Sequence, residues 1–194
     1  RMMAKVEGMP LAALEHGVTW DWSSFAEYLD RLDGRIGVNA GFLVGHCQLR
    51  RYVMGADGDG PADDAQVAAM VAELRAALDA GGLGFSSTQS FSHNDGDGKP
   101  VPSRNATVDE LLALCEVVAD YEGTTLEYIT DGCLKGFTDE EVRRITDMSL
   151  RGRRAVNWNV LTVDSRDPGS VDHQLAASER AAADGGRIVP LTMP

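Results

Sequence analysis

The sequence predicts an α/β fold in which parallel strands alternate with helices. Short apolar segments with few charges recur along the chain, and longer segments between them carry apolar residues at spacings of three and four. This alternation implies right-handed crossovers and a parallel sheet covered by helices. A closed eight-stranded barrel usually needs about 250 residues. The 194 residues of this chain therefore predict an incomplete barrel or an open sheet.

Five apolar segments are predicted to be buried strands. Each is short, and most are bounded by glycine or polar residues, which is typical of strands in a parallel sheet. They cover residues 36–44, 83–86, 125–130, 155–163 and 187–191.

Helical periodicity fills the segments between these strands. Phe25, Leu29 and Leu32 lie on one face of a helix over residues 24–32. Three further helices are predicted from capping residues at their starts. One covers residues 64–80 with Asp63 and Gln66 as its cap, and two begin at the pairs Thr107 with Glu110 and Thr138 with Glu141. A last helix is predicted after residues 167–169.

The composition indicates which kinds of partner the protein can bind and in which cell compartment it folds. The net charge of −12 argues against a nucleic-acid partner, because phosphate backbones require clustered Lys and Arg. No apolar run approaches the roughly 18 residues of a membrane span. Cys47, Cys115 and Cys133 form neither a disulfide framework nor a zinc-binding pattern. We therefore expect a cytoplasmic protein without a nucleic-acid or membrane partner.

Polar side chains after several strands are expected to form a site, because the carboxyl ends of parallel strands meet at one edge of the sheet. His46 follows the first strand and either orients substrate or water, or is hydrogen-bonded to a loop. Arg50 either binds a substrate carboxylate or pins a loop. Ser86 and Ser87 either contact a ligand or satisfy the end of the second strand.

The remaining candidates lie further along the chain. His93, in the long irregular segment after the second strand, is either a lid residue or an exposed loop residue. Glu127 can ligate a metal, act as a general base or pair with a basic side chain. Asn157 and Asn159 point the same way and line a pocket or close a hydrogen-bond network. We take His46 and Glu127 as candidate catalytic residues and the others as candidate substrate contacts.

Three motifs in the first half of the chain occur together. Residues 45–50 read Gly-His-Cys-Gln-Leu-Arg, residues 53–55 read Val-Met-Gly, and Met70 precedes a Gly-Phe-Ser at 84–86. In this combination the sequence resembles D-aminoacylase and related N-acyl-D-amino-acid deacylases of the amidohydrolase superfamily. The resemblance implies a TIM barrel that hydrolyses C–N bonds other than peptide bonds, in N-acyl amino acids or related small amides, through a zinc-bound water.

The resemblance also places most zinc ligands outside this chain. A His-x-His, a cysteine and an aspartate of the family would precede or follow it. Two further family histidines correspond to Tyr128, or to Glu127 if the register shifts by one, and to Asn159. Glutamate is an acceptable zinc ligand, whereas tyrosine and asparagine are poor ones. The alternative function is a non-catalytic relative, depleted of its metal site, that binds a small molecule.

The ends of the chain predict its domain organisation. The sequence starts directly in structured-looking residues and stops at the end of a predicted strand. We expect residues 1–194 to form a single α/β unit, a fragment of the catalytic barrel of a longer chain. Open sheet edges invite pairing with another chain, so a homo-oligomer is expected if the unit exists alone. Without the resemblance, an open sheet that binds a ligand at its strand ends is the alternative.

Overall fold

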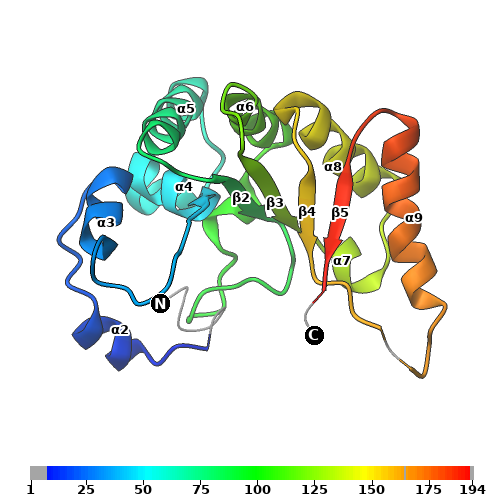
Figure 1. The fold of residues 1–194 in the computed structure, drawn as a ribbon, viewed down its shortest axis with the longest axis horizontal. Coiled ribbons are helices and arrows are strands. Elements are labelled where there is room, and N and C mark those ends of the chain that lie inside the picture. The colour runs from blue at the N-terminus through cyan, green and yellow to red at the C-terminus, as the bar shows by residue number, and fades with distance from the viewer. Residues whose placement is uncertain (1–7, 164, 193–194) are drawn as a thin grey trace.

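The protein is described by a computed structural model that covers residues 8–163 and 165–192. Its centre is a sheet of parallel strands in the order of the sequence (Figure 1), so the predicted parallel α/β architecture is confirmed. The strands are β1 (Val44–Gly45), β2 (Gly84–Thr88), β3 (Thr125–Ile129), β4 (Val156–Asn159) and β5 (Ile188–Leu191).

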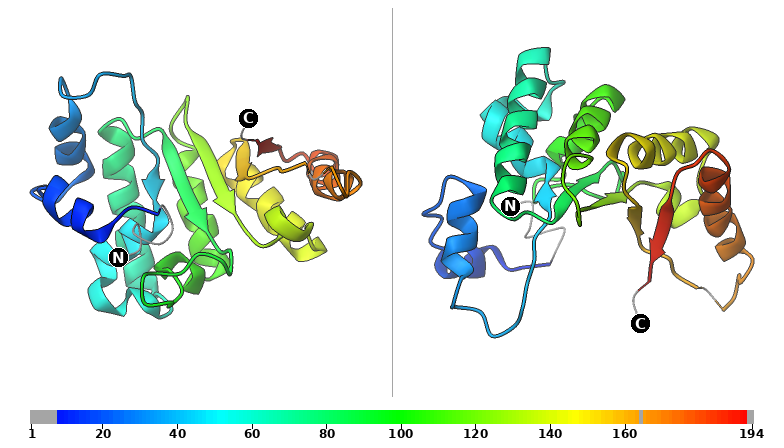
Figure 2. Two further views of the ribbon diagram at one scale, coloured as in Figure 1. Left: turned by 90° about the horizontal axis from the view of Figure 1, so that it is seen from below. Right: turned by 45° about the horizontal axis from the view of Figure 1, so that its top comes forward.

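Helices connect the strands and lie mainly on one side of the sheet (Figures 1 and 2). The α-helices are α2 (Leu11–Gly17), α3 (Phe25–Leu32), α4 (His46–Met54), α5 (Asp64–Asp79), α6 (Val108–Val118), α7 (Gly132–Lys135), α8 (Asp139–Gly152) and α9 (Ser170–Ala183). Short 3-10 turns, η1 (Gly55–Asp59) and η2 (Pro102–Asn105), precede α5 and α6. Among the described residues, none of these helices has both the length and the apolar character needed to cross a membrane.

Alternation along the strands gives the sheet two different faces. The side chains of Phe85, Leu126, Val156 and Ile188 stand side by side in register and are almost fully buried. They form the core with residues of α5, α6 and α8. Their sequence neighbours point to the opposite side, where the strand residues are only half-buried. We call this opposite side the open face.

Gly84 is required where β2 approaches β3. Its φ of +136° lies in a region that residues with a side chain rarely adopt, and a Cβ atom there would lie 1.9 Å from the carbonyl oxygen of Thr125. Thr125 pairs directly with Gly84 in the register of the two strands. The glycine therefore permits the pairing that aligns the polar residues of β2 and β3.

The predicted strand over residues 36–44 is wrong for most of its length, because only Val44 and Gly45 form β1. The side chain of Val38 is 73% exposed. Phe42 packs edge-on against Tyr28 of α3, with ring centroids 5.2 Å apart, so its apolar character reflects an aromatic contact. Among the described residues β1 is an edge strand, and the segment has no second neighbour to extend it. The strand predicted over 155–163 likewise ends at Asn159.

Helix α4 was missed by the sequence analysis, and His46 is its first residue rather than a residue beyond a long strand. The helix starts after Gly45 without a side-chain cap, so it lacks the usual starting signal. Helix α2, preceded by Pro10 and also uncapped by a side chain, was missed for the same reason. The capping boxes that open α5 and α8 are confirmed.

The capping box predicted for α6 is only half formed. The hydroxyl of Thr107 accepts a hydrogen bond from the Glu110 backbone N–H at 3.2 Å. The carboxylate of Glu110 does not return to the cap, because it is bonded to His46 and Arg50 instead. Glu110 thereby joins a buried polar cluster with His46 and Arg50, which belong to α4.

Candidate functional site

Polar residues from three neighbouring strands meet on the open face. Ser86, Glu127 and Asn157 occupy one row in the register of β2, β3 and β4. Asn159, two residues after Asn157, points to the same side. We call these four residues the open-face row. Ser86 and Glu127 are the middle residues of β2 and β3, and Asn159 is the last residue of β4. Barrel enzymes build their sites at the carboxyl ends of the strands, which Asn159 reaches here.

Two hydrogen bonds fix the amide groups of the open-face row. The side-chain amide of Asn159 donates to Oε1 of Glu127 at 2.6 Å. The amide of Asn157 donates to the hydroxyl of Thr125 at 3.1 Å. Both asparagines thus point their N–H groups along the sheet, and the structure brings together four residues predicted from the sequence. Their functional role stays a prediction.

Tyr128 lies on the other face, among the helices. It is almost fully buried, and its hydroxyl donates to Oε1 of Gln89 at 2.6 Å. Arg144 donates to the same oxygen at 2.8 Å. Burial raises the pKa of Tyr128 to about 12, so the phenol remains protonated. Of the two residues that the sequence analysis left open at this position, only Glu127 faces the open side.

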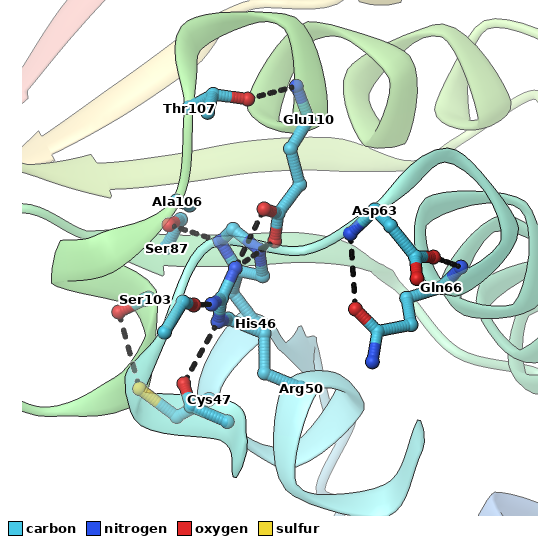
Figure 3. Close-up of polar contacts among 12 residues, drawn as sticks. His46, Cys47, Arg50, Asp63, Gln66, Ser87, Ser103, Ala106, Thr107 and Glu110 are labelled. Atoms are coloured by element: carbon cyan, nitrogen blue, oxygen red, sulfur yellow. Dashed lines mark hydrogen bonds and ion pairs between the residues drawn. The ribbon is translucent and has the colours of Figure 1, made fainter. Parts of the chain in front are cut away.

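His46, Arg50, Ser87 and Glu110 form a second group, which we call the buried cluster (Figure 3). His46 Nδ1 lies 2.8 Å from the Ser87 hydroxyl, and His46 Nε2 lies 2.8 Å from Oε1 of Glu110. One guanidinium nitrogen of Arg50 contacts both Glu110 oxygens, at 2.5 and 2.6 Å. Arg50 also donates to the backbone carbonyls of Gly58 and Gly60.

The hydrogen bonds of the buried cluster are consistent with a neutral histidine. Nε2–H of His46 donates to the Glu110 carboxylate, and Nδ1 accepts from the Ser87 hydroxyl. The positive Arg50 and the negative Glu110 then balance each other, and their side chains are 0% and 1% exposed. Such pairing is what buried charges require.

The ionisation of the cluster follows from burial and pairing. Burial lowers the pKa of His46 below its ordinary value, although the hydrogen bond and charge of Glu110 oppose the shift. Burial by itself would raise the pKa of Glu110. Hydrogen bonds from His46 and Arg50 outweigh this effect and hold the pKa of that carboxyl below its usual range. The cluster therefore keeps a neutral imidazole and an ionised carboxylate at neutral pH.

The predicted site residues thus divide between two places. Ser86 and Glu127 lie on the open face, whereas His46, Arg50 and Ser87 lie in the buried cluster. Their polar groups are already bonded there, which favours the structural alternatives for His46 and Arg50. His93 lies in the loop after β2, and the contacts described for its backbone are with that loop, to Ser90, Val101 and Arg104.

Sequence reasoning missed the partner that organises the buried cluster. Glu110 occupies the third position of a capped helix, and that position alone explains a glutamate. Only the fold brings it to Arg50, 60 residues earlier in the chain. No local signal in the sequence distinguishes Glu110 from Glu141, which does close its capping box.

The described residues do not fit a zinc site by themselves. They contain no group of three or more His, Cys, Asp or Glu side chains close enough to hold a metal ion. The open-face row offers one carboxylate and neutral groups. Cys115 and Cys133 are buried, which raises the pKa of both thiols, that of Cys133 to about 12, and Cys47 is bonded to Ser103. The thiols of Cys115 and Cys133 therefore stay protonated at neutral pH and are not thiolate ligands.

The sequence of this chain is similar to that of known proteins. A model of the amidohydrolase family matches residues 6–187. A D-aminoacylase of Alcaligenes xylosoxydans xylosoxydans is 30% identical over 123 residues, which are 63% of this chain and 23% of that protein. The chain thus spans about a quarter of the length of this relative.

Two solved structures share the fold. A crystal structure of D-aminoacylase has a TM-score of 0.69 and 25% identity, over 92% of this chain and 35% of that one. N-acyl-D-glutamate deacylase from Bordetella bronchiseptica, solved with zinc and a phosphonate inhibitor, has a TM-score of 0.60 and 24% identity, over 85% and 33% of the two chains. The chain therefore spans about a third of each of these structures.

Proposed function

The chain belongs to the amidohydrolase family, and on this premise we propose that it forms part of the barrel of a hydrolase acting on C–N bonds. The substrates proposed are N-acyl amino acids or related small amides, as the names of the D-aminoacylase and the N-acyl-D-glutamate deacylase suggest. The partial barrel predicted from the sequence is confirmed by its likeness to D-aminoacylase. Closure of the barrel by segments outside this chain is part of the proposal.

The observation that carries the proposal is the open-face row. Three neighbouring strands place a hydroxyl, a carboxylate and two amides on one side of the sheet, in one row and at the carboxyl end of β4. Ser86, Asn157 and Asn159 are proposed to contact the substrate. Glu127 is proposed to accept a hydrogen bond or a proton from it. His93 remains a candidate contact from the loop after β2.

A metal is proposed for the whole protein, with ligands that come mainly from outside this chain. The Bordetella enzyme was solved with zinc, and a D-aminoacylase structure is described by its binuclear metal centre. The described residues do not complete such a site. The part of the site proposed for this chain therefore consists of the contacts made by its own side chains.

For His46, Arg50 and Ser87 we propose a structural role. Arg50 joins the start of α6 to the turn η1, because it bonds Glu110 and the carbonyls of Gly58 and Gly60. Its guanidinium is occupied, and it is buried, which argues against the alternative of a clamp for a substrate carboxylate. A cytoplasmic location is proposed because all three cysteines are buried and free.

Hydrolysis by the full-length protein tests the proposal. We expect release of free amino acid from N-acetyl-D-amino acids, and we expect Glu127→Gln to lower kcat/KM about tenfold or more. Glu122→Gln removes the same charge from an exposed residue before β3 and should leave kcat/KM unchanged. A protein that holds no metal and is inert toward these substrates and related amides would refute the proposal.

A second candidate function is a binding protein that has lost the metal centre. Two observations favour it, namely that Tyr128 is turned into the helix layer and that Asn159 is committed to Glu127. This candidate predicts saturable binding of small amides without turnover. Ordered zinc ligated by residues of this chain in a crystal would count against it.

A further inference from the structure

Among the described strand residues that point to the open face, a single one carries a formal charge. The strand residues that point to it are Ser86, Thr88, Thr125, Glu127, Ile129, Asn157, Asn159, Val189 and Leu191. Glu127 is the only ionisable residue among them. Within the described residues, no nitrogen of Lys, Arg or His forms an ion pair with its carboxylate. A half-buried carboxylate without a cation favours a ligand that brings positive charge or N–H donors.

The hydrogen bonds on this face leave acceptors free. Asn159 uses an N–H group to bond Oε1 of Glu127, and Asn157 uses one to bond Thr125. No described donor reaches Oε2 of Glu127 or the carbonyl oxygens of the two asparagines. The face thus offers three acceptor groups. A primary ammonium carries three donors and no acceptor, and its chemistry is complementary to this set.

Two of the described arginines are not available to an anion at this place. Arg50, the residue suited to a carboxylate by its chemistry, is bonded to Glu110 behind the sheet. The Arg144 guanidinium bonds Gln89 and Glu140 on the helix side. A substrate carboxylate placed against β3 and β4 would meet Glu127 and be repelled.

We propose that Glu127, with Asn157 and Asn159, recognises an ammonium or other N–H-rich group of the ligand. This inference rests on the proposed function and narrows its substrates to small amides that carry a cationic group on the part lying against β3 and β4. Glu127 is then a specificity-determining contact. Its carboxylate remains bonded to Asn159 while it accepts N–H from the ligand.

The test is a calorimetric titration of the full-length protein with three matched probes. They are Nα-acetyl-D-lysine amide, Nα-acetyl-D-norleucine amide and Nα-acetyl-D-glutamate α-amide, which present an ammonium, a methyl and a carboxylate. We expect the lysine probe to bind about tenfold or more tightly than the norleucine probe. The glutamate probe should bind most weakly. Equal affinities, or no binding of the lysine probe, would overturn the proposal.

Variants test whether Glu127 causes the preference for the lysine probe. Glu127→Gln keeps the shape of the side chain and removes its charge, and we expect the ratio of the lysine and norleucine affinities to fall to about one. Glu122→Gln, the exposed control, should keep the full ratio. Asn159→Leu, which removes one acceptor at similar volume, should lower the ratio in part and provides a second test if Glu127→Gln does not fold. Survival of the full ratio in Glu127→Gln would refute the assignment.

Two further measurements distinguish ammonium recognition by Glu127 from the proposed hydrolase function on which it rests. Chromatography of the titrated samples records hydrolysis, so a preserved ammonium preference without turnover would remove the proposed hydrolase and leave the recognition in place. Elemental analysis of the full-length protein measures bound metal. The metal content should be the same in wild type and Glu127→Gln. Loss of one metal equivalent in the variant would show that Glu127 is a metal ligand and would overturn the inference.

Discussion

At the scale of single residues, Glu110 determines the charge balance of the buried cluster. Its carboxylate accepts hydrogen bonds from His46 and from Arg50 while its side chain is 1% exposed. It thereby forgoes the capping bond that Glu141 makes in the equivalent position of α8. Pairing with Arg50 is more favourable than capping the helix, because an unpaired buried guanidinium destabilises the fold far more than a missing capping hydrogen bond does.

We predict that Glu110→Gln lowers the free energy of unfolding by about 3–5 kcal/mol, because it leaves the charge of Arg50 buried without a partner. Urea denaturation of the two proteins measures the difference. Asp59→Asn breaks the exposed pair with Arg51, whose side chains are 42% and 44% exposed, and should cost less than about 1 kcal/mol. Equal, small losses of unfolding free energy in both variants would mean that the buried pair stabilises the fold no more than the exposed pair does.

His46 is predicted to make stability depend on pH below neutrality. Burial lowers its pKa in the folded state, so the unfolded chain takes up a proton first as the pH falls below about 6.5. The contribution of His46 is thus fully present above that value and declines as the pH falls. His46→Gln should flatten the rise of unfolding free energy from pH 5.5 to 6.5 by roughly 1 kcal/mol.

The control for this prediction is His173→Gln, at an exposed position of α9. It should leave the pH dependence as in the wild type. Denaturation curves at pH 5.5, 6.5 and 7.5 suffice for all three proteins. An unchanged slope in His46→Gln would contradict the assignment of a neutral, buried imidazole.

At the scale of elements, the junction of β2 and β3 depends on one glycine. Gly84→Ala adds a Cβ atom that would lie 1.9 Å from the Thr125 carbonyl, at a φ of +136°. We predict a loss of about 2–4 kcal/mol from strain and overpacking. Gly37→Ala, in a loop where no atom lies within 4 Å of the added Cβ, is the matched control and should cost little. Thermal unfolding of both variants gives the comparison.

Elements with strong local signals were predictable from the sequence, and elements set by tertiary contacts were not. Helices α5 and α8 begin at complete capping boxes, and their starts were predicted correctly. Helix α4 starts without a side-chain cap, directly after β1. The apolar residues before β1 suggested a longer strand, but Phe42 packs on Tyr28. A strand needs a neighbour, and the sequence of one segment does not reveal whether it has one.

The same distinction applies to the candidate site. Period-two alternation placed Asn157 and Asn159 on one side of a strand, and the structure has them there. The choice between Glu127 and Tyr128 required the core, because both residues are compatible with a strand and only packing turns Tyr128 toward the helices. The partner of His46 and Arg50 was beyond sequence reasoning, since Glu110 is brought to them by the β–α connections of the sheet.

At the scale of the whole molecule, the sheet has two unpaired edges. Within the described residues, β1 and β5 each have a single neighbour. Pro190 lies in β5 and lacks a backbone N–H, a feature that weakens pairing at an edge. Strand β1 is formed by two residues only. Short strands and proline limit edge pairing without abolishing it, and the half-buried open face adds apolar surface at Ile129, Val189 and Leu191.

We therefore predict that the 194-residue chain, prepared alone, associates in solution. Pairing at the sheet edges and burial of the open face both lower the free energy of association. Sedimentation velocity at several concentrations should give a mass well above the 20.8 kDa of the chain. In the full-length protein, where we propose that further strands close the barrel, the same surfaces are covered and association through them should disappear. A concentration-independent mass of one chain for the isolated unit would show that the open face is stable in water and would argue against its place inside a barrel.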